Sequence, residues 1–253
     1  LLMRKNVKAK TEQGLFGLVG SSTPQELAQR LLDRSPAFQA CEQLVKSALI
    51  NIGRPKEVAK GEYVCRSGKP VTRVCMLLDG VLEIARIQSD GHRHLVGLAL
   101  PGDFISFTGM IDGGAHLHDV LARNDALIME FSAPEFSNLR QQHISLVMAC
   151  ERLLVRRMRL MYDRLAADPA WVLENRLAHM LCMCADLFAK KEAVVSNDID
   201  IGLSQTDVAD MLGISRQSVN FALKKMETEG LVRLHYSRIS VANMTLLKQL
   251  AES

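Results

Sequence analysis

The spacing of hydrophobic residues divides the chain into three zones. Between residues 24 and 50, apolar residues recur at helical spacing, and Thr23 ahead of a proline is typical of a helix cap. From 55 to 136, short runs rich in Val, Leu and Ile alternate with glycines, which is typical of the strands of a sandwich or barrel. From 137 onward the spacing is mostly helical again. The pattern therefore predicts an α+β protein in which a β-rich zone precedes a helical one.

Three strands and two turns stand out within the β-rich zone. The runs Val74–Leu78, Val81–Ala85 and Leu95–Ala99 are predicted to be strands. Asp79-Gly80 and Asp90-Gly91 are predicted to be hairpin turns, because glycine accepts the positive φ that such turns require. Since no segment with helix-length periodicity interrupts this zone, we expect an all-β sandwich or barrel.

A long helix is predicted over residues 137–166. Its apolar residues follow the a/d spacing of three heptads and form a narrow stripe at Ile144, Val147, Leu154, Met158, Met161 and Leu165. Glu151 is the one polar residue on this stripe. A helix of about 30 residues is roughly 45 Å long, which is more than the preceding strands can easily cover. The stripe therefore favours pairing with the same helix of a second chain; packing against its own domain is the alternative.

The most informative segment spans residues 203–226, which are predicted to form two helices joined by a tight turn. Ser204 and Asp207 have the spacing of a cap at the start of the first helix. Gly213 supplies the left-handed residue that ends this helix, and Ser215 caps the second one. The second helix has an apolar face formed by Val219, Ala222, Leu223 and Met226. These features together predict a helix-turn-helix.

This helix-turn-helix is predicted to bind DNA. Gly230 ends the second helix, and the alternating residues 231–241 predict a two-stranded wing. Arg and Gln side chains can read base edges, and serine hydroxyls suit phosphate oxygens. The predicted DNA contacts are Ser204, Gln205, Thr206, Ser215, Arg216, Gln217, Ser218, Asn220, Phe221, Lys224 and Arg238. A helical hairpin with a merely polar outer face is the alternative, but the agreement of caps, glycine turn and wing favours DNA binding.

Composition and charge change this interpretation only in detail. Hydrophobic residues make up 48% of the 253 residues and charged residues 23%, which excludes a disordered chain. The chain has no apolar run of the roughly 18 residues that would predict a membrane span. The net charge is only +3, and residues 196–253 carry six Lys or Arg against seven Asp or Glu. DNA affinity must therefore come from a few well-placed charges, raised by dimerisation, rather than from a diffuse basic patch.

The cysteines bear on zinc binding and on location. None of the six lies in a Cys-x-x-Cys pair, so a structural zinc site is not expected. Their scattered positions are typical of reduced thiols and predict a cytoplasmic protein. Cys65 and Cys75, on predicted strands, are expected to be buried packing residues. Cys182 and Cys184 are two apart on a predicted helix, so a disulfide between them is not expected.

The order of these segments resembles the Crp/Fnr family of bacterial transcription regulators, over about residues 30–247. Residues 60–84 look like the opening of the family's cyclic-nucleotide-binding-type roll, and residues 203–231 look like its DNA-binding helices. The resemblance implies a double-stranded β-helix (jelly-roll) effector domain, a long dimerisation helix and a C-terminal winged helix-turn-helix. It also implies a homodimer that binds palindromic double-stranded DNA and works with RNA polymerase. An effector at the roll would shift the population between DNA-competent and incompetent dimers.

With this resemblance, the chain is predicted to contain four segments. A Pro at position 169, directly after Asp168, indicates a break and the start of a helix that runs to about residue 191. The segments are a flexible N-terminal stretch 1–23, a cyclic-nucleotide-binding-like β-roll sensor 24–136, a dimerisation helix and hinge 137–167, and a winged helix-turn-helix domain 168–253.

The resemblance places an effector pocket at Gly102, Asp103, Phe104, Phe107, His116 and His118. Cyclic-nucleotide members of the family hold the phosphate with an Arg and a small hydroxyl residue shortly after this turn. Here the stretch 111–121 has no Arg, and Asp112 and Asp119 would repel a phosphate, so cyclic AMP and cyclic GMP are not expected. No Cys precedes Cys41, which makes an iron–sulfur cluster of the family's type improbable. Ile105, Ser106 and Phe107 occupy the stretch where haem members place Cys or His.

Two histidine pairs are candidate ligands. His116 and His118 would lie on one side of a strand and could ligate a metal or haem, but a plain loop pair is the favoured interpretation. His92 and His94 are interpreted as an exposed strand end. No metal site is therefore predicted, and the cofactor, if one exists, is left unidentified.

The recognition helix departs from the common family pattern at two positions. Many members have Glu at the position of Gln217 and Arg at the position of Phe221. Gln217 would favour adenine, and Phe221 could meet a thymine methyl group. We therefore predict a half-site that differs from the commonest one in the family.

Two functional hypotheses remain open. The first is a homodimeric regulator controlled by an effector or redox signal at the roll; the second is a constitutive DNA-binding regulator with a vestigial effector domain. An enzyme is not expected, because the sequence shows no nucleophile–base set, phosphate loop or metal triad with suitable spacing. The target genes and the choice between activation and repression are left open.

Overall fold

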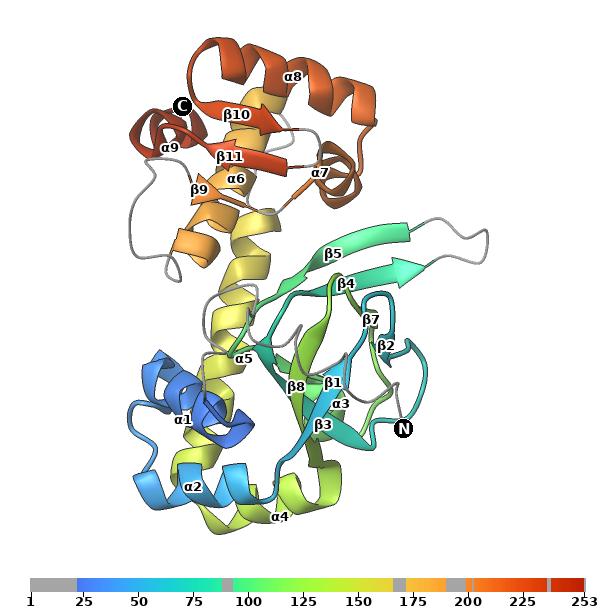
Figure 1. Ribbon diagram of the computed structural model, residues 1–253, viewed down its shortest axis with the longest axis vertical. Helices are drawn as coiled ribbons and strands as arrows, with labels where there is room; N and C mark the ends of the chain where they lie inside the picture. Colours follow the sequence, from blue (N-terminus) through green and yellow to red (C-terminus); the bar gives the residue numbers. More distant parts are fainter. Residues whose placement is uncertain are drawn as a thin grey trace, which may run out of the picture. The chain divides into compact units, whose positions relative to one another are not determined.

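The computed structural model describes residues 22–87, 93–165, 172–189, 199–201, 203–235 and 238–252 (Figure 1). Contacts divide the chain into two compact units, and the boundary along the chain lies between Arg156 and Arg157. The predicted flexible residues 1–21, the Asp90-Gly91 turn and the Asp168-Pro169 helix start lie outside the described residues. Across the part of the chain that is described, no helix is long and apolar enough to cross a membrane.

The first unit opens with two helices and a short 3₁₀ turn: α1 (Pro24–Arg34), η1 (Pro36–Phe38) and α2 (Gln43–Asn51). The predicted cap at Thr23 is confirmed. The Glu26 N–H donates to Thr23 Oγ1 at 3.2 Å, and the Thr23 N–H donates to Glu26 Oε2 at 2.8 Å. This reciprocal pair satisfies two backbone donors that a helix start otherwise leaves open, so α1 begins where the sequence predicts.

Eight strands form two four-stranded antiparallel sheets in this unit. They are β1 (Arg54–Val58), β2 (Tyr63–Cys65), β3 (Arg73–Asp79), β4 (Leu82–Ile87), β5 (Arg93–Ala99), β6 (Phe104–Ile105), β7 (Asp119–Ala122) and β8 (Ala126–Ser132). The strand orders are β1-β8-β3-β6 and β2-β7-β4-β5. Side chains from both sheets share one buried cluster, which includes Leu77 and Ile128 from the first sheet and Leu82 and Val120 from the second. The predicted β-roll is therefore confirmed.

The predicted hairpin turn at Asp79-Gly80 is wrong. Strands β3 and β4 flank it, but they pair with different partners in different sheets, so the chain crosses here from one sheet to the other. Gly80 does have a positive φ of 92°. A Cβ at this position would lie 2.8 Å from Ala126 Cα and 2.9 Å from Asp125 O. Glycine is thus required by the close approach of the chain to the start of β8 as well as by φ.

Helices differ from the prediction in two places. The β-rich zone contains a six-residue helix, α3 (Phe107–Asp112), which is too short to show a helical period in the sequence. The predicted helix over 137–166 is two helices, α4 (Ala133–Gln142) and α5 (Ile144–Leu165). His143 separates them with an extended backbone (φ −131°, ψ 103°) and accepts the Leu146 N–H at 3.0 Å. A break of one residue leaves the average spacing of apolar residues almost unchanged, so the sequence pattern does not reveal it.

A second buried cluster joins the helices of this unit to one sheet. Its centre is aromatic, and its aromatic members are Phe38, Phe104, Phe107, Phe131 and Phe136. Leu146, Ala149 and Cys150 of α5 and Val45 and Leu49 of α2 complete it. The first half of α5 is therefore anchored in the same core that holds the turn before α3.

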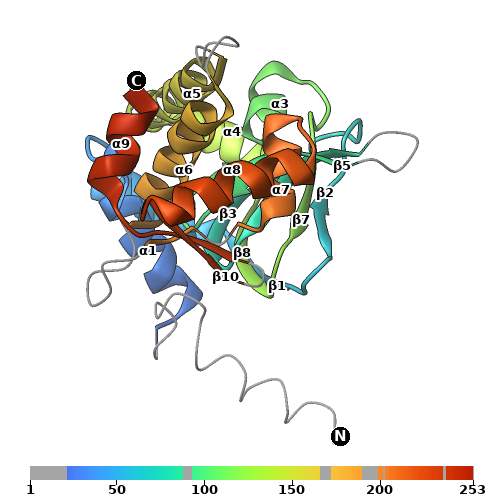
Figure 2. The same cartoon turned by 90° about the horizontal axis from the view of Figure 1, so that it is seen from above.

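The second unit is a helical domain with a small sheet. After the last residues of α5, it comprises α6 (Leu173–Ala189), β9 (Ile199–Asp200), α7 (Gln205–Leu212), α8 (Arg216–Thr228), β10 (Val232–His235), β11 (Arg238–Val241) and α9 (Met244–Glu252). The antiparallel sheet has the order β10-β11-β9. Val172, placed on the predicted helix face, precedes α6 and is exposed. Helices α7 and α8 lie side by side in both views (Figure 2).

One partly buried ion pair links α1 to α2 in the first unit. Lys46 Nζ lies 2.9 Å from Asp33 Oδ1, and the Lys46 side chain is only 8% exposed. The hydrogen bond from Lys46 is the main cause that holds the pKa of Asp33 below its ordinary value, and a bond from Gln29 adds to it. Ionised Asp33 therefore stabilises the fold at neutral pH, and this contribution is lost as the pH falls through the lowered pKa.

We expect Asp33→Asn to lower the free energy of unfolding at pH 7 by up to about 1 kcal/mol, because half-exposed ion pairs contribute little. The deficit should shrink as the pH is lowered from about 4, where Asp33 of the unfolded chain begins to be protonated, through the lower pKa of Asp33 in the folded protein. Urea unfolding at pH 7 and at pH 3 measures both values, with Glu57→Gln at an exposed carboxylate on β1 as the control. A stability deficit that grows as the pH is lowered would contradict the predicted pH dependence.

Candidate nucleic-acid interface

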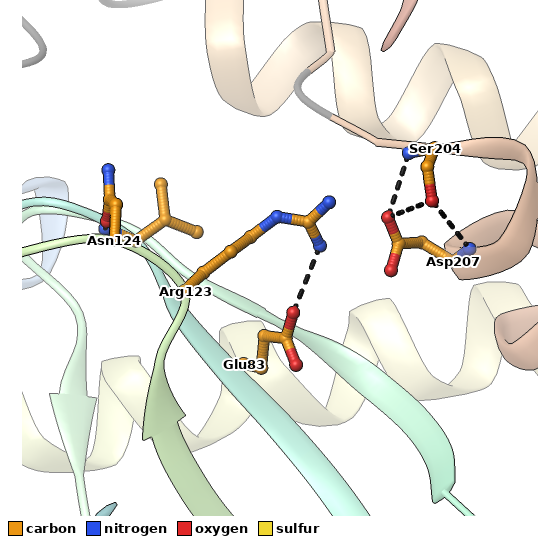
Figure 3. Close-up of polar contacts among 6 residues, drawn as sticks. Glu83, Arg123, Asn124, Ser204 and Asp207 are labelled. Atoms are coloured by element: carbon orange, nitrogen blue, oxygen red, sulfur yellow. Dashed lines mark hydrogen bonds and ion pairs between the residues drawn. The ribbon is translucent and has the colours of Figure 1, made fainter. Parts of the chain in front are cut away.

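The start of α7 is fixed by the predicted cap. The Asp207 N–H donates to Ser204 Oγ at 3.2 Å, while the backbone N–H and the hydroxyl of Ser204 donate to Asp207 Oδ2 at 2.8 and 2.7 Å (Figure 3). Gly213, with φ 65°, ends the helix as the sequence predicts. The first helix of the pair therefore has its two ends set by local chemistry alone.

The second helix, α8, is capped and packed as predicted. The Ser218 N–H donates to Ser215 Oγ at 3.1 Å, and the two hydroxyl oxygens are 2.8 Å apart. The inner face is buried to 1% exposure or less at Val219, Ala222, Leu223 and Met226. Burial of this face leaves the opposite face of α8 free for a partner.

The predicted DNA-contacting residues gather around α8 and the start of α7. The exposed ones are Thr206, Ser215, Arg216, Gln217, Ser218, Phe221, Lys224 and Arg238. Ser204, Gln205 and Asn220 are half-buried. Phe221 is 75% exposed, which is unusual for a side chain of its size. The outer face of α8 thus combines hydrogen-bonding side chains, a cation and an aromatic ring.

The wing is a three-stranded sheet rather than a two-stranded one. The predicted strands form β10 and β11, and β9 adds a third strand beside β11. With only two residues, β9 gives no period in the sequence. Arg238, at the start of β11, lies with Nη1 3.2 Å from Asp200 Oδ2 of β9. The guanidinium that was predicted to contact DNA is therefore also oriented by a neighbouring carboxylate.

Two further contacts hold α8 within its unit, and neither was predicted. Lys225 Nζ lies 3.0 Å from Glu174 Oε1 on α6. The hydrogen bond lowers the pKa of Glu174 and raises the pKa of Lys225. The Leu234 N–H of β10 donates to Glu227 Oε1 at 2.8 Å. The partners of the first contact are 51 residues apart in sequence, so no local pattern could have paired them.

The stripe on α5 is only partly exposed. Ile144, Met158 and Met161 are 73, 47 and 61% exposed. Val147 and Leu154 are half-buried, and Leu154 packs against the aromatic cluster; the side chain of Leu165 lies outside the described side chains. Other exposed apolar residues widen the surface on one side, namely Met148, Val155 and Tyr162. The free apolar face of α5 is therefore rotated slightly from the predicted stripe, because part of that stripe completes the first unit's own core.

The two phenylalanines of the predicted effector pocket belong to the packed interior. Phe104 and Phe107 are 2 and 1% exposed within the aromatic cluster. Asp103 accepts the Leu100 N–H through Oδ2 at 2.7 Å, and Gly102 has φ 96°. These residues hold the turn before α3 in shape. Among the predicted pocket residues, the side chains that are partly accessible are those of Asp103, His116 and His118.

Both histidines lie in the loop before β7, in agreement with the favoured interpretation. The backbone of His116 bonds to Gly68 and Lys69 at 2.8 and 2.9 Å. Burial lowers the pKa of both imidazoles, and nearby Arg86 lowers that of His118 further. Burial therefore favours the neutral form of both imidazoles. Among the described residues, no group of three His, Cys, Asp or Glu side chains is placed to hold a metal ion.

A groove that the sequence did not suggest lies beside this loop. Its volume is about 820 Å³, and its walls come from Gly68 and residues 70–72, from α3 and the loop after it, and from the start of α4. The lining side chains are small, apolar or hydroxylic, with no ionisable group among them. The groove therefore offers no fixed charge that could hold a phosphate.

The thiols of the first unit are protonated at neutral pH. Burial raises the pKa of Cys65 to about 11 and those of Cys75 and Cys150 to about 12. Burial also raises the pKa of Cys41. The predicted burial of Cys75 is confirmed, while Cys65 is half-buried, and all six cysteines of the chain are free. Because the thiolate is the reactive form, these four thiols are poor redox sensors in this structure.

The turn after β7 is held by polar contacts that the sequence did not single out. Arg123 Nη1 lies 3.2 Å from Glu83 Oε1 of β4, and both side chains are largely buried (Figure 3). The next residue, Asn124, accepts the Val81 N–H through Oδ1 at 2.8 Å. These contacts tie the two middle strands of the second sheet together at one end.

Two family models match the chain. Residues 55–143 match the cyclic nucleotide-binding domain, and residues 175–250 match the Crp-like helix-turn-helix domain. The first match covers the β-roll, and the second covers α6 to α9. Each match therefore falls within one of the two compact units.

Curated relatives align over most of the chain. The nitrogen fixation regulation protein FixK of Bradyrhizobium diazoefficiens is 26% identical over 202 residues, which are 79% of this chain and 83% of that protein. The transcriptional activator protein FnrL of Cereibacter sphaeroides is 25% identical over 210 residues, 78% of this chain and 80% of that protein. The CRP-like cAMP-activated global transcriptional regulator of Mycobacterium tuberculosis is 23% identical over 87% of this chain and 98% of its own length.

Solved structures show the same fold. FixK2 from Bradyrhizobium japonicum covers 78% of this chain and 96% of its own with a TM-score of 0.68 at 20% identity. The c-di-GMP responsive regulator CLP from Xanthomonas campestris covers 80% of this chain and 100% of its own with a TM-score of 0.66 at 18% identity. With both family models matched in the expected order and regulators as relatives, the chain belongs to the Crp/Fnr family of DNA-binding transcription regulators.

Proposed function

We propose that the protein acts as a homodimer that binds a palindromic operator, with α8 of each chain in the major groove of one half-site. The observation that carries this proposal is the outer face of α8, where Arg216, Gln217, Phe221 and Lys224 are all exposed while the opposite face is buried. One helix of 13 residues reads too few base pairs to distinguish an operator from other DNA, so two copies are needed.

The free apolar face of α5 is the surface that we propose for pairing with the second copy. Ile144, Met148, Val155, Met158 and Tyr162 are exposed and separated by helical spacings of three, four or seven residues. That spacing is typical of two helices packed along a common seam. Glu151 interrupts the seam and is exposed. A charged residue in a seam costs stability, so the pair is expected to be of moderate strength rather than permanent.

The proposed control is an effector at the β-roll other than a cyclic nucleotide. Some relatives are described as cAMP-activated or c-di-GMP responsive. Residues 101–121 of this chain contain no Lys or Arg, and the nearby groove has no ionisable side chain. A phosphate group would therefore be desolvated there without a cation to compensate it.

A constitutive regulator is the second candidate, and the aromatic cluster favours it. Phe104 and Phe107 fill the turn that the family resemblance assigns to the effector. A thermal-shift screen of small metabolites separates the two candidates. Effector control predicts at least one compound that raises the melting temperature and changes DNA affinity, whereas tight DNA binding by the bare protein with no hit supports the constitutive regulator.

Location and further partners follow from the proposed function. A regulator of this kind must reach the chromosome, which supports a cytoplasmic location in a bacterium. RNA polymerase is the proposed protein partner, because a DNA-bound dimer affects transcription through contact with, or obstruction of, that enzyme. The relatives named as a transcriptional regulator and a transcriptional activator support both proposals.

Selection from a pool of random duplexes tests the proposed function. The full-length protein should enrich an inverted repeat whose half-site centres are about 34 Å apart, roughly one turn of B-DNA. This spacing follows from two recognition helices related by a twofold axis. Enrichment of a single asymmetric site, or of no sequence, would contradict the proposal.

A further inference from the structure

The recognition helix presents a large apolar side chain at the centre of an otherwise polar face. Phe221 is 75% exposed, whereas the apolar residues Val219, Ala222 and Leu223 beside it in sequence are at most 1% exposed. A ring left this exposed adds almost nothing to the core of its own unit. Because exposed aromatic side chains are enriched at binding surfaces, the position of Phe221 points to a contact in the complex.

The spacing of neighbouring residues defines where this contact falls. Gln217, Phe221 and Lys224 are related as i, i+4 and i+7, so they form one ridge along the outward face of α8. Gln217 and Phe221 are one helical turn apart, about 5.4 Å along the axis. Base pairs in B-DNA are stacked about 3.4 Å apart. Phe221 therefore meets a base pair one or two steps from the one that Gln217 contacts.

The direction of the ring is set by contacts within the unit. The Ser215 cap holds the start of α8, and Lys225 pairs with Glu174 of α6 at 3.0 Å. The buried residues on the inner face fix the rotation of the helix about its axis. A Phe side chain has only two rotatable angles, so little entropy is lost when it is held against DNA.

The chemistry of the major groove leaves one kind of group for such a ring. Base edges there present hydrogen-bond donors and acceptors, which a Phe ring cannot satisfy, and the C5 methyl group of thymine, which it can pack against. 5-Methylcytosine carries the same methyl group on the same ring atom. We propose that Phe221 is a specificity-determining residue that recognises the C5 methyl group of a pyrimidine, thymine or 5-methylcytosine, in each half-site. This inference rests on the proposed binding of DNA through α8.

Recognition of a methyl group by Phe221 makes binding sensitive to DNA methylation as well as to sequence. A cytosine at the base pair facing Phe221 becomes a better partner when it is methylated, because methylation supplies the group that the ring contacts. DNA methylation then raises the affinity of the regulator for such a site. Burial of one carbon is worth about fourfold in affinity, so a palindrome with two contacted methyl groups gains roughly fifteenfold.

The test uses the full-length protein and an operator enriched from random duplexes. Each thymine is replaced in turn, symmetrically in both half-sites, by deoxyuridine, which lacks only the methyl group. At one position we expect the dissociation constant to rise about fifteenfold. In a second duplex, cytosine at that base pair is compared with 5-methylcytosine, and the methylated duplex should bind more tightly by a similar factor. Fluorescence anisotropy at fixed salt concentration measures all four constants.

Two variants assign the effect to the ring. Phe221→Ala should bind the thymine and uracil duplexes equally, and likewise the cytosine and 5-methylcytosine duplexes. Leu246→Ala, at a 43% exposed apolar residue of α9, is the matched control and should retain both differences. Since Phe221 is exposed, its removal leaves the core intact, and circular dichroism verifies the fold.

Three results would overturn the inference while leaving the proposed function in place. They are equal binding of thymine and uracil duplexes at every position, equal binding of cytosine and 5-methylcytosine duplexes, or full discrimination by Phe221→Ala. The first and second results would also be expected if the ring acted as a wedge between base steps. Failure to enrich any duplex at all would instead contradict the proposed function.

Discussion

Replacing Phe104 by Ala lowers the free energy of unfolding of the first unit by about 3–5 kcal/mol, the range for loss of a fully buried Phe. The ring is 2% exposed and lies at the centre of four others. Its centroid is 5.7 Å from that of Phe38, 6.2 Å from that of Phe131 and 6.4 Å from those of Phe107 and Phe136. Removal leaves a cavity that these rings cannot all collapse to fill.

The loss of stability should extend beyond the strands of the β-roll. Phe104 shares its cluster with α2 and with the first half of α5, so the variant loosens the anchor of the proposed pairing helix. Chemical unfolding followed by circular dichroism measures the effect. Phe221→Ala serves as the matched control, because it removes the same ring from an exposed position and should change stability by less than about 0.5 kcal/mol. Equal losses in the two variants would contradict the burial assigned to Phe104.

Replacing Arg216 by Ala weakens operator binding by about 1–3 kcal/mol for each half-site, hence by about 2–6 kcal/mol for a dimer on a palindrome. Arg216 is the first residue of α8 and is exposed. The N-terminal end of a recognition helix is the part that contacts base edges. A guanidinium there can bond to guanine O6 and N7 together, so its loss should also relax the base preference at one position.

Lys248→Ala is the matched control for Arg216, because it removes one exposed positive charge from α9 of the same unit. Titration of labelled operator and of single-base variants measures affinity and specificity together. If Arg216 acted only through its charge on the DNA backbone, the two variants would lose affinity equally, and the loss would be the same for every operator sequence. If Arg216→Ala bound the operator with wild-type affinity, Arg216 would not contribute to the DNA interface.

The helix-turn-helix could be predicted closely from sequence because its determinants are local. The Ser204 and Ser215 caps act within three residues, and Gly213 ends α7 through its own φ. The buried face of α8 follows directly from helical spacing. The family resemblance was borne out by the two matched family models for the same reason, since its motifs lie in continuous segments.

Features that depend on distant residues could not be predicted in this way. The role of Gly80 follows from the approach of Ala126, 46 positions later, so the dipeptide alone suggested a hairpin. The packing of Phe104 and Phe107 depends on rings from η1, β8 and α4. The contact between Lys225 and Glu174 joins two helices through side chains 51 residues apart. The shape of the candidate effector site could not be predicted from the sequence either, because it depends on how these distant segments pack.

The central claim is that two chains together place two recognition helices on one operator. Size-exclusion chromatography with light scattering, run on the full-length protein with and without an enriched 30-base-pair duplex, tests it most directly. We expect the mass of two chains of 28.1 kDa bound to one duplex. A complex that contains a single chain per duplex at every protein concentration would contradict it.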